Sequence, residues 1–232
     1  MSSTLICFAL KEEAAPFRKI AAGKTGITIL LTGIGRQNAE KSLREFLNSR
    51  RSRGDETQIK KESETPHVVS YEPDLVLTCG FAGGLNPHLK IGDVVFEIPQ
   101  PSTFNLQLST YGATSAKFFC ADRIATTVTE KKKLRAETGA DAVEMESAAI
   151  HAVCRERGIP CATIRVISDT ADEDLPLDFN ALSKPDKNLD FGKLFLAIAK
   201  SPEKIGALMQ LQKKTRFAAE QLAAVLQKII FP

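Results

Sequence analysis

The sequence predicts a single α/β domain, a three-layer sandwich in which helices flank a central, mixed but mostly parallel sheet. Its apolar runs are short, continuous and rich in β-branched residues, and helical patterns at 11–21 and 36–47 separate the first of them. Apolar strands that alternate with helices are typical of a sheet covered on both faces. The expected strands are 4–9, 27–31, 74–79, 93–98 and 161–167. A length of 232 residues suffices for one substantial core. The sequence shows no internal repeat, and we expect a single domain over 1–232.

Two segments depart from this alternation. Residues 48–72 are charged, mixed in sign and poor in large apolar groups, which predicts a solvated loop or a frayed helical extension. Residues from about 203 to 229 repeat apolar side chains every three or four positions. That spacing predicts an amphipathic helix that docks on the domain or on a partner.

Composition argues against several classes of function. The 31 basic and 28 acidic residues leave a net charge of only +3, and Trp is absent, so a nucleic-acid partner is not expected. The N-terminal MSSTLICFALKEE has neither the basic start of a signal peptide nor the length of a membrane span, which predicts a cytoplasmic protein. Five cysteines without a C-x-x-C pair predict reduced thiols, and the three histidines lack metal-ligand spacing, so no metal is expected.

Glycine-bearing turns are expected at GIGR (33–36), GFAGGL (80–85) and IGD (91–93). Glycine lets a backbone approach a ligand closely, and a helix that starts after such a turn offers free N–H groups to an anion. The G-x-G-x-x-G spacing of a dinucleotide site is not met, because Asn38 stands at the third glycine position, so no cofactor is expected. Each turn, taken singly, is also compatible with a simple connection.

Acidic residues in apolar surroundings give a stronger signal. Asp169 follows the strand at 161–167, and Glu12 and Glu13 follow the first strand. Parallel strands deliver such residues to the carboxyl edge of a sheet, where ligands bind in open α/β folds. These acids therefore either converge on one crevice or cap helices, and the residues alone leave both interpretations open.

Several motifs occur together in one order along the chain. They are ALKEEAAPF (9–17), GIGRQNA (33–39), PDLVLTCGFAGGLNPHLKIGDVV (73–95) and VEMESAAIHAVCRERGIPCATIRVISDTAD (143–172). This set resembles the nucleoside phosphorylase/nucleosidase superfamily, and within it the 5′-methylthioadenosine/S-adenosylhomocysteine nucleosidases. Residues 127–147 and the C-terminal tail also resemble a hopanoid-associated phosphorylase-like branch, which implies a more apolar entrance to the site.

The resemblance implies a role for each matching residue. Asp169 matches the acid that protonates the purine at N7, which requires a carboxyl group whose pKa burial has raised. Glu146 matches the carboxylate that binds the ribose hydroxyls, and Met145 the thioether packed on the ribose face. Glu13 matches the acid that activates water, although Lys11 replaces the first acid of that triplet and Glu12 competes for the role. Glu144 is expected to be structural.

The remaining expected substrate contacts come from the glycine-rich segment, the purine-stacking segment and the residue before Asp169. They are Phe81, Ala82, Gly83, Ile124 and Ser168. Phe81 stands where the hydrolases usually carry a small residue, and Ile124 where an aromatic ring is typical. The stretch between Val95 and Lys117 is also short. These departures bear on the 5′-substituent and on dimer geometry.

The sequence therefore predicts hydrolytic cleavage of the N-glycosidic bond of an adenine nucleoside, without a cofactor. One alternative is phosphorolysis, with phosphate held at Arg36 and Gly35. Another is a nucleoside-binding protein in which Phe81 blocks attack. The resemblance further implies a homodimer or a higher homo-oligomer.

Overall fold

A computed structural model describes residues 3–58, 72–98, 108–182, 196 and 199–231. Its strands form one mixed sheet. The strands are β1 (Thr4–Phe8), β2 (Ile27–Leu31), β3 (Leu75–Gly84), β4 (Val94–Glu97), β5 (Ala113–Ser115), β6 (Phe118–Cys120), β7 (Ala142–Glu144) and β8 (Cys161–Asp169). The helices are α1 (Lys11–Ala21), α2 (Arg36–Gln58), α3 (Val128–Thr138), α4 (Ser147–Arg157) and α6 (Ile205–Ile230), with 3₁₀ turns η1 (Leu108–Tyr111) and η2 (Pro202–Lys204).

The sheet is mostly parallel in its centre. Its main path runs β2-β1-β3-β8-β4-β5, while β7 pairs with the far end of β3 and with β6. The β1–β2, β1–β3 and β3–β8 pairs are parallel, whereas β4 runs antiparallel to β8 and β7 antiparallel to β3. The expected fold class, a mixed and mostly parallel sheet between helices, is confirmed.

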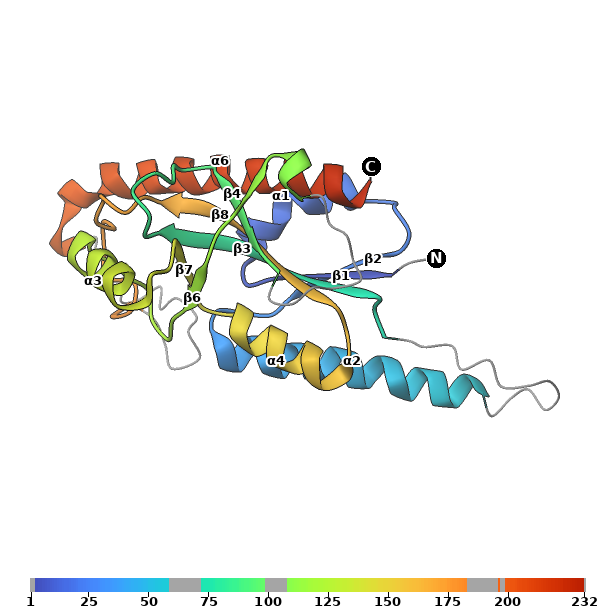
Figure 1. The fold of residues 1–232 in the computed structure, drawn as a ribbon. Coiled ribbons are helices and arrows are strands. Elements are labelled where there is room, and N and C mark those ends of the chain that lie inside the picture. The colour runs from blue at the N-terminus through green and yellow to red at the C-terminus, as the bar shows by residue number, and fades with distance from the viewer. Residues whose placement is uncertain (1–2, 59–71, 99–107, 183–195, 197–198, 232) are drawn as a thin grey trace.

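Helices cover both faces of this sheet (Figure 1). Helices α1 and α6 lie on one face, where Phe17 of α1 and Leu222 of α6 join a buried cluster with strand residues such as Leu77. Helices α2 and α4 cover the other face through Leu43 and Ile150. Each fully buried side chain of this size contributes roughly 1.5–3 kcal/mol of transfer free energy. The apolar faces of the helices therefore hold the three layers together.

The structure changes several of the expected boundaries; among the strands, β8 extends two residues further than expected, to Asp169. The GFAGGL segment is not a turn, because β3 continues through Gly84 and pairs with both β8 and β7. The charged segment expected over 48–72 is helical as far as Gln58, and 59–71 lie outside the described residues. The C-terminal helix spans Ile205–Ile230.

The extension of β3 has a local cause. Gly80 adopts a φ of +148°, and the register against β8 shifts between Ala82 and Gly83. Glycine tolerates the first conformation and a bulge accommodates the second, so the strand can pass through a sequence that looks like a turn.

Within the described helices, none combines the length and the apolar character required to cross a bilayer.

Candidate functional site

A pocket of about 790 Å³ opens where β1, β3 and β8 end. Its volume lies within the range of small-molecule sites. It is lined by Ala9, Leu10, Glu12, Glu13, Ile34, Phe81, Ala82, Gly83, Arg123, Ile124, Ala125, Val143, Glu144, Met145, Glu146, Ser168, Asp169, Leu175, Phe179, Leu211 and Thr215. The structure bears out both interpretations that the sequence left open: Glu12, Glu13 and Asp169 line one crevice, and Glu13 also caps α1 by accepting from the N–H of Leu10.

Of the two glutamates at the start of α1, Glu13 is the one whose carboxyl group is fixed by hydrogen bonds. It is 4% exposed, and its two carboxyl oxygens accept hydrogen bonds from the N–H groups of Leu10 and Phe81, each at 2.9 Å. Burial raises the pKa of Glu13, although these hydrogen bonds and the charge of Arg165 oppose the shift. Glu12 also lines the pocket but is exposed. Glu13 is thus the better placed of the two for proton transfer.

Arg165 of β8 is the charge centre beneath the pocket. Its Nη2 lies 2.6 Å from Glu144 Oε2 and 3.3 Å from Glu146 Oε2, and it also donates to Thr78 Oγ1 at 3.2 Å. The side chain is 1% exposed, and its Nε has no hydrogen-bond partner among the described residues. Burial alone would lower the pKa of Arg165, but Glu144, Glu146 and Glu13 together raise it. The guanidinium is therefore a fixed positive charge.

Gly80 lets Glu13 and Arg165 approach the same point of the backbone. A Cβ at this position would lie 2.7 Å from Arg165 Nη1 and 2.8 Å from Glu13 Oε1. Arg165 Nη1 also donates to the carbonyl of Cys79 at 3.4 Å. Glycine here is thus required by close approach as well as by its positive φ.

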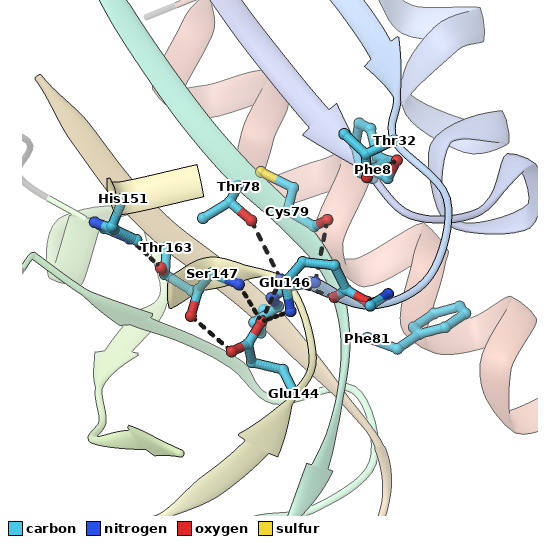
Figure 2. Close-up of polar contacts among 12 residues, drawn as sticks. Phe8, Thr32, Thr78, Cys79, Phe81, Glu144, Glu146, Ser147, His151 and Thr163 are labelled. Carbon is cyan, nitrogen blue, oxygen red and sulfur yellow. Dashed lines mark hydrogen bonds and ion pairs between the residues drawn. The ribbon is translucent and has the colours of Figure 1, made fainter. Parts of the chain in front are cut away.

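The acids of the VEMES motif divide into two roles. Glu144 accepts hydrogen bonds from the N–H groups of Glu146 and Ser147, at 3.0 and 2.8 Å, and from Ser147 Oγ at 2.6 Å (Figure 2). Burial would raise the pKa of Glu144, but Arg165 and these hydrogen bonds outweigh it and lower the pKa. Glu144 thus fixes the start of α4, as expected of a structural acid.

Glu146 is the less compensated of the two acids. Its Oε1 accepts a hydrogen bond from the N–H of Gly35 at 2.8 Å, which ties it to the turn after β2. Burial, together with the charges of Glu144 and Glu13, raises the pKa of Glu146 to about 7 despite the attraction of Arg165. Met145 is buried beside it and also lines the pocket. This arrangement suits a carboxylate that accepts hydrogen bonds from ligand hydroxyls.

Asp169 lies at the end of β8 with both carboxyl oxygens engaged. Ser168 Oγ lies 2.7 Å from Oδ1, and the Lys131 ammonium lies 2.6 Å from Oδ2. Asp169 is 6% exposed, so the burial expected for this acid is present. The lysine partner was not expected from the sequence.

The pocket omits two of the predicted site residues. Gly35 does not line it, but it acts on it through the hydrogen bond to Glu146. Arg36 does not line it either, because its guanidinium donates to the carbonyl of Cys120 and pairs with Asp122 at 3.5 Å. Asp122 itself is exposed. An anion site at Arg36 therefore has little support from the geometry.

Sequence reasoning missed residues that reach the pocket from distant segments. Leu211 and Thr215 of α6, and Leu175 and Phe179 after β8, contribute to its wall. The amphipathic pattern of the C-terminal segment identified the helix without indicating which face would meet the site.

Among the described residues, no group of three or more His, Cys, Asp or Glu side chains is placed to hold a metal ion.

Chemically, the pocket combines four buried carboxyl groups, those of Glu13, Glu144, Glu146 and Asp169, with a largely apolar wall that also includes the exposed Glu12 and Arg123. Glu13 and Asp169 can exchange protons with a ligand, and Glu146 can accept hydrogen bonds. Such a set fits acid–base chemistry on a small, partly apolar, hydroxyl-bearing molecule.

Comparison with known proteins relates the chain to one superfamily. Residues 113–200 match the family model described as the Phosphorylase superfamily. A 5′-methylthioadenosine/S-adenosylhomocysteine nucleosidase of Shewanella oneidensis is 32% identical over 153 aligned residues, covering 49% of this chain. The match spans 63% of that relative's length, which is less than two thirds.

Solved structures share the whole fold. The 5′-methylthioadenosine/S-adenosylhomocysteine nucleosidase of Helicobacter pylori, in complex with butyl-thio-DADMe-Immucillin-A, has a TM-score of 0.63 at 18% identity, covering 99% of this chain and 98% of that one. Futalosine hydrolase of the same organism has a TM-score of 0.59 at 18% identity, with 98% of each chain covered. The resemblance predicted from the sequence is therefore confirmed, and the chain has the fold of these nucleosidases together with a sequence match to the phosphorylase superfamily.

Proposed function

We propose that the protein hydrolyses the N-glycosidic bond of an adenine nucleoside. The observation that carries the proposal is the convergence of Glu13, Glu146 and Asp169 on one pocket from three separate parts of the chain. The similarity to methylthioadenosine/S-adenosylhomocysteine nucleosidases supports the same reaction and suggests methylthioadenosine, S-adenosylhomocysteine or a related 5′-substituted adenosine as substrate.

In the proposed reaction, the C1′–N9 bond breaks and its electron pair leaves with the purine. Asp169 transfers a proton to N7, which neutralises the leaving base. The ribosyl group becomes oxocarbenium-like, and the Glu146 carboxylate binds its hydroxyls and stabilises its positive charge. Water then attacks C1′ and gives up a proton to Glu13. One proton has left Asp169 and one has reached Glu13, so the charges balance within the turnover. Loss of a proton from Glu13 to solvent and uptake of one by Asp169 then restore the starting state.

Hydrolysis is favoured over phosphorolysis by the charge of the pocket. Glu12 and Glu13 both line the pocket, and a carboxylate repels phosphate. Arg36, the expected phosphate ligand, is engaged by Cys120 and Asp122.

The test is adenine release from adenosine and methylthioadenosine, with and without phosphate. We expect release at equal rates in both buffers, and ribose or its 5′-methylthio derivative as the second product. A strict phosphate requirement, or a ribose 1-phosphate product, would replace hydrolysis with phosphorolysis. Saturable binding of adenosine without release of adenine would support the nucleoside-binding alternative.

Asp169→Asn and Glu13→Gln test the assigned roles. Each is expected to lower kcat by about 10²–10⁴-fold, the usual contribution of a general acid or base, while the fold persists. A near-normal rate for either variant would remove that residue from the mechanism.

A single domain over 1–232 and a homodimer or higher homo-oligomer in the cytoplasm stay predictions. The single domain is supported by the continuous sheet that joins strands from both halves of the chain. Light scattering on the purified protein measures the assembly, and a monomer at micromolar concentration would contradict the oligomer.

A further inference from the structure

Lys131 is a buried charge that the proposed reaction does not yet use. It belongs to the first turns of α3 and is 0% exposed. Its ammonium lies 2.6 Å from Asp169 Oδ2 and donates to the carbonyl oxygens of Thr170 at 2.7 Å and Glu173 at 2.8 Å. An ammonium has three protons, and this geometry uses all three. The neutral amine would leave one of these acceptors without a donor.

Stability alone gives a weak reason for this lysine. Removing an ammonium from water costs several kcal/mol before its partners compensate. The position is also unfavourable for a cation, because the N-terminal end of a helix carries partial positive charge. An apolar side chain would avoid both costs but would leave Asp169 Oδ2 and the carbonyl oxygens of Thr170 and Glu173 without this donor. Because one of these three acceptors belongs to the proposed acid, the buried lysine points to a role at that carboxyl.

We propose that Lys131 is a positioning residue for Asp169. Its ammonium occupies Oδ2 of Asp169 and thereby leaves Oδ1 as the oxygen that carries the proton to the purine. The inference rests on the proposed function. A second consequence concerns the transition state. Once the proton has left, Asp169 becomes a carboxylate, and the ammonium stabilises the new negative charge. Lys131 therefore favours proton transfer to the purine and also determines which oxygen of Asp169 carries the proton.

Ser168 can accommodate both states of Oδ1. Its hydroxyl lies 2.7 Å from Oδ1 and 3.3 Å from the carbonyl oxygen of Ala82. When Asp169 is ionised, the hydroxyl donates to Oδ1. When Oδ1 carries the proton, the hydroxyl can donate to Ala82 instead, because a hydroxyl has one proton and rotates freely. Oδ2, by contrast, faces a group that can only donate.

The inference predicts a dependence on the leaving group. Adenine needs protonation as it departs, whereas the 4-nitrophenolate of 4-nitrophenyl β-D-ribofuranoside departs as a stable anion. Lys131→Met should lower kcat for adenosine by about 10²-fold, and kcat for the aryl riboside by about tenfold or less. Asp169→Asn should show the same pattern. Lys131→Gln is the second variant, in case Lys131→Met does not fold.

Lys214→Met is the matched control. Lys214 lies 2.8 Å from Glu173 Oε2, so it anchors the same loop without contacting Asp169. Its loss should leave the ratio of the two kcat values at the wild-type level. The double variant Lys131→Met/Asp169→Asn should be no slower on adenosine than Asp169→Asn alone, because residues that act as a unit are not additive.

The outcomes test the role of Lys131 and the nucleosidase assignment separately. Equal losses of Lys131→Met on both substrates, or additive losses in the double variant, would overturn the role of Lys131 and leave the nucleosidase assignment intact. A wild-type protein that releases neither adenine nor 4-nitrophenolate would overturn the proposed function, and this inference with it.

Discussion

Glu144 and Arg165 form a buried ion pair, with Oε2 2.6 Å from Nη2 and both side chains no more than 4% exposed. The pair joins β7 to β8 beneath the pocket. The pair also gives the two acids of the VEMES motif different roles. Glu144 neutralises most of the charge of the guanidinium, whereas Glu146 Oε1 accepts a hydrogen bond from the N–H of Gly35.

Breaking this pair should destabilise the fold strongly. Glu144→Gln leaves a buried guanidinium with less compensation, and the expected loss in the free energy of unfolding is about 3 kcal/mol or more. Urea denaturation measures it. Glu156→Gln is the control, since Glu156 pairs with Arg44 on the surface and such pairs contribute little. Similar losses for both variants would contradict the importance given to burial.

Gly80→Ala should damage the site through contact as well as conformation. The new Cβ would lie within 2.8 Å of both Arg165 and Glu13, so we expect a loss of about 1–3 kcal/mol in stability and a large fall in adenine release. Gly158→Ala is the control, because Gly158 also has a positive φ, of +68°, but no atom within 4 Å of its Cβ position. It should lose about 1 kcal/mol and retain activity.

The rate of adenine release should fall as the pH drops below about 7. Glu146 must be ionised to accept two ribose hydroxyls, and its pKa is raised to about 7. The expected signal is a decline of kcat/KM on the acid side of that value. Glu146→Gln should lower the plateau by about tenfold to a hundredfold and remove the decline near pH 7. An unchanged profile in the variant would assign the decline to another group.

His151 should make the fold sensitive to acid. Burial lowers its pKa from 6.5 to about 4, and Nε2 lies 2.7 Å from Thr163 Oγ1. The folded state therefore binds the proton less readily than the unfolded chain, and stability that is present above pH 6.5 is lost as the pH falls toward 4. The full difference is about 3 kcal/mol.

The control for this prediction is the difference between wild type and His151→Gln, because Glu146 titrates in the opposite sense. Its raised pKa makes protonation favour the folded state, so its contribution is lost as the pH rises through about 7. Thermal unfolding at pH 4–8 measures both proteins. A constant difference across this range would rule out His151 as the acid-sensitive group.

The sequence by itself determined the layered fold and two of the acids that line the pocket. Continuous apolar strands predict a covered parallel sheet. Asp169 ends β8 and Glu13 lies in the first turn of the helix after β1, so their place at the carboxyl edge of the sheet is a consequence of local order. The resemblance added Glu146, Met145 and Phe81, all of which line the pocket.

The tertiary structure decided which charges act together. Lys131 is one of three consecutive lysines at 131–133, and only the tertiary fold buries this one beside Asp169. Arg165 lies within an apolar strand, where nothing local indicates the three glutamates that surround it. Partners far apart in the chain are set by the registry of the sheet and the docking of helices, because a charge becomes a strong influence only where burial removes it from water.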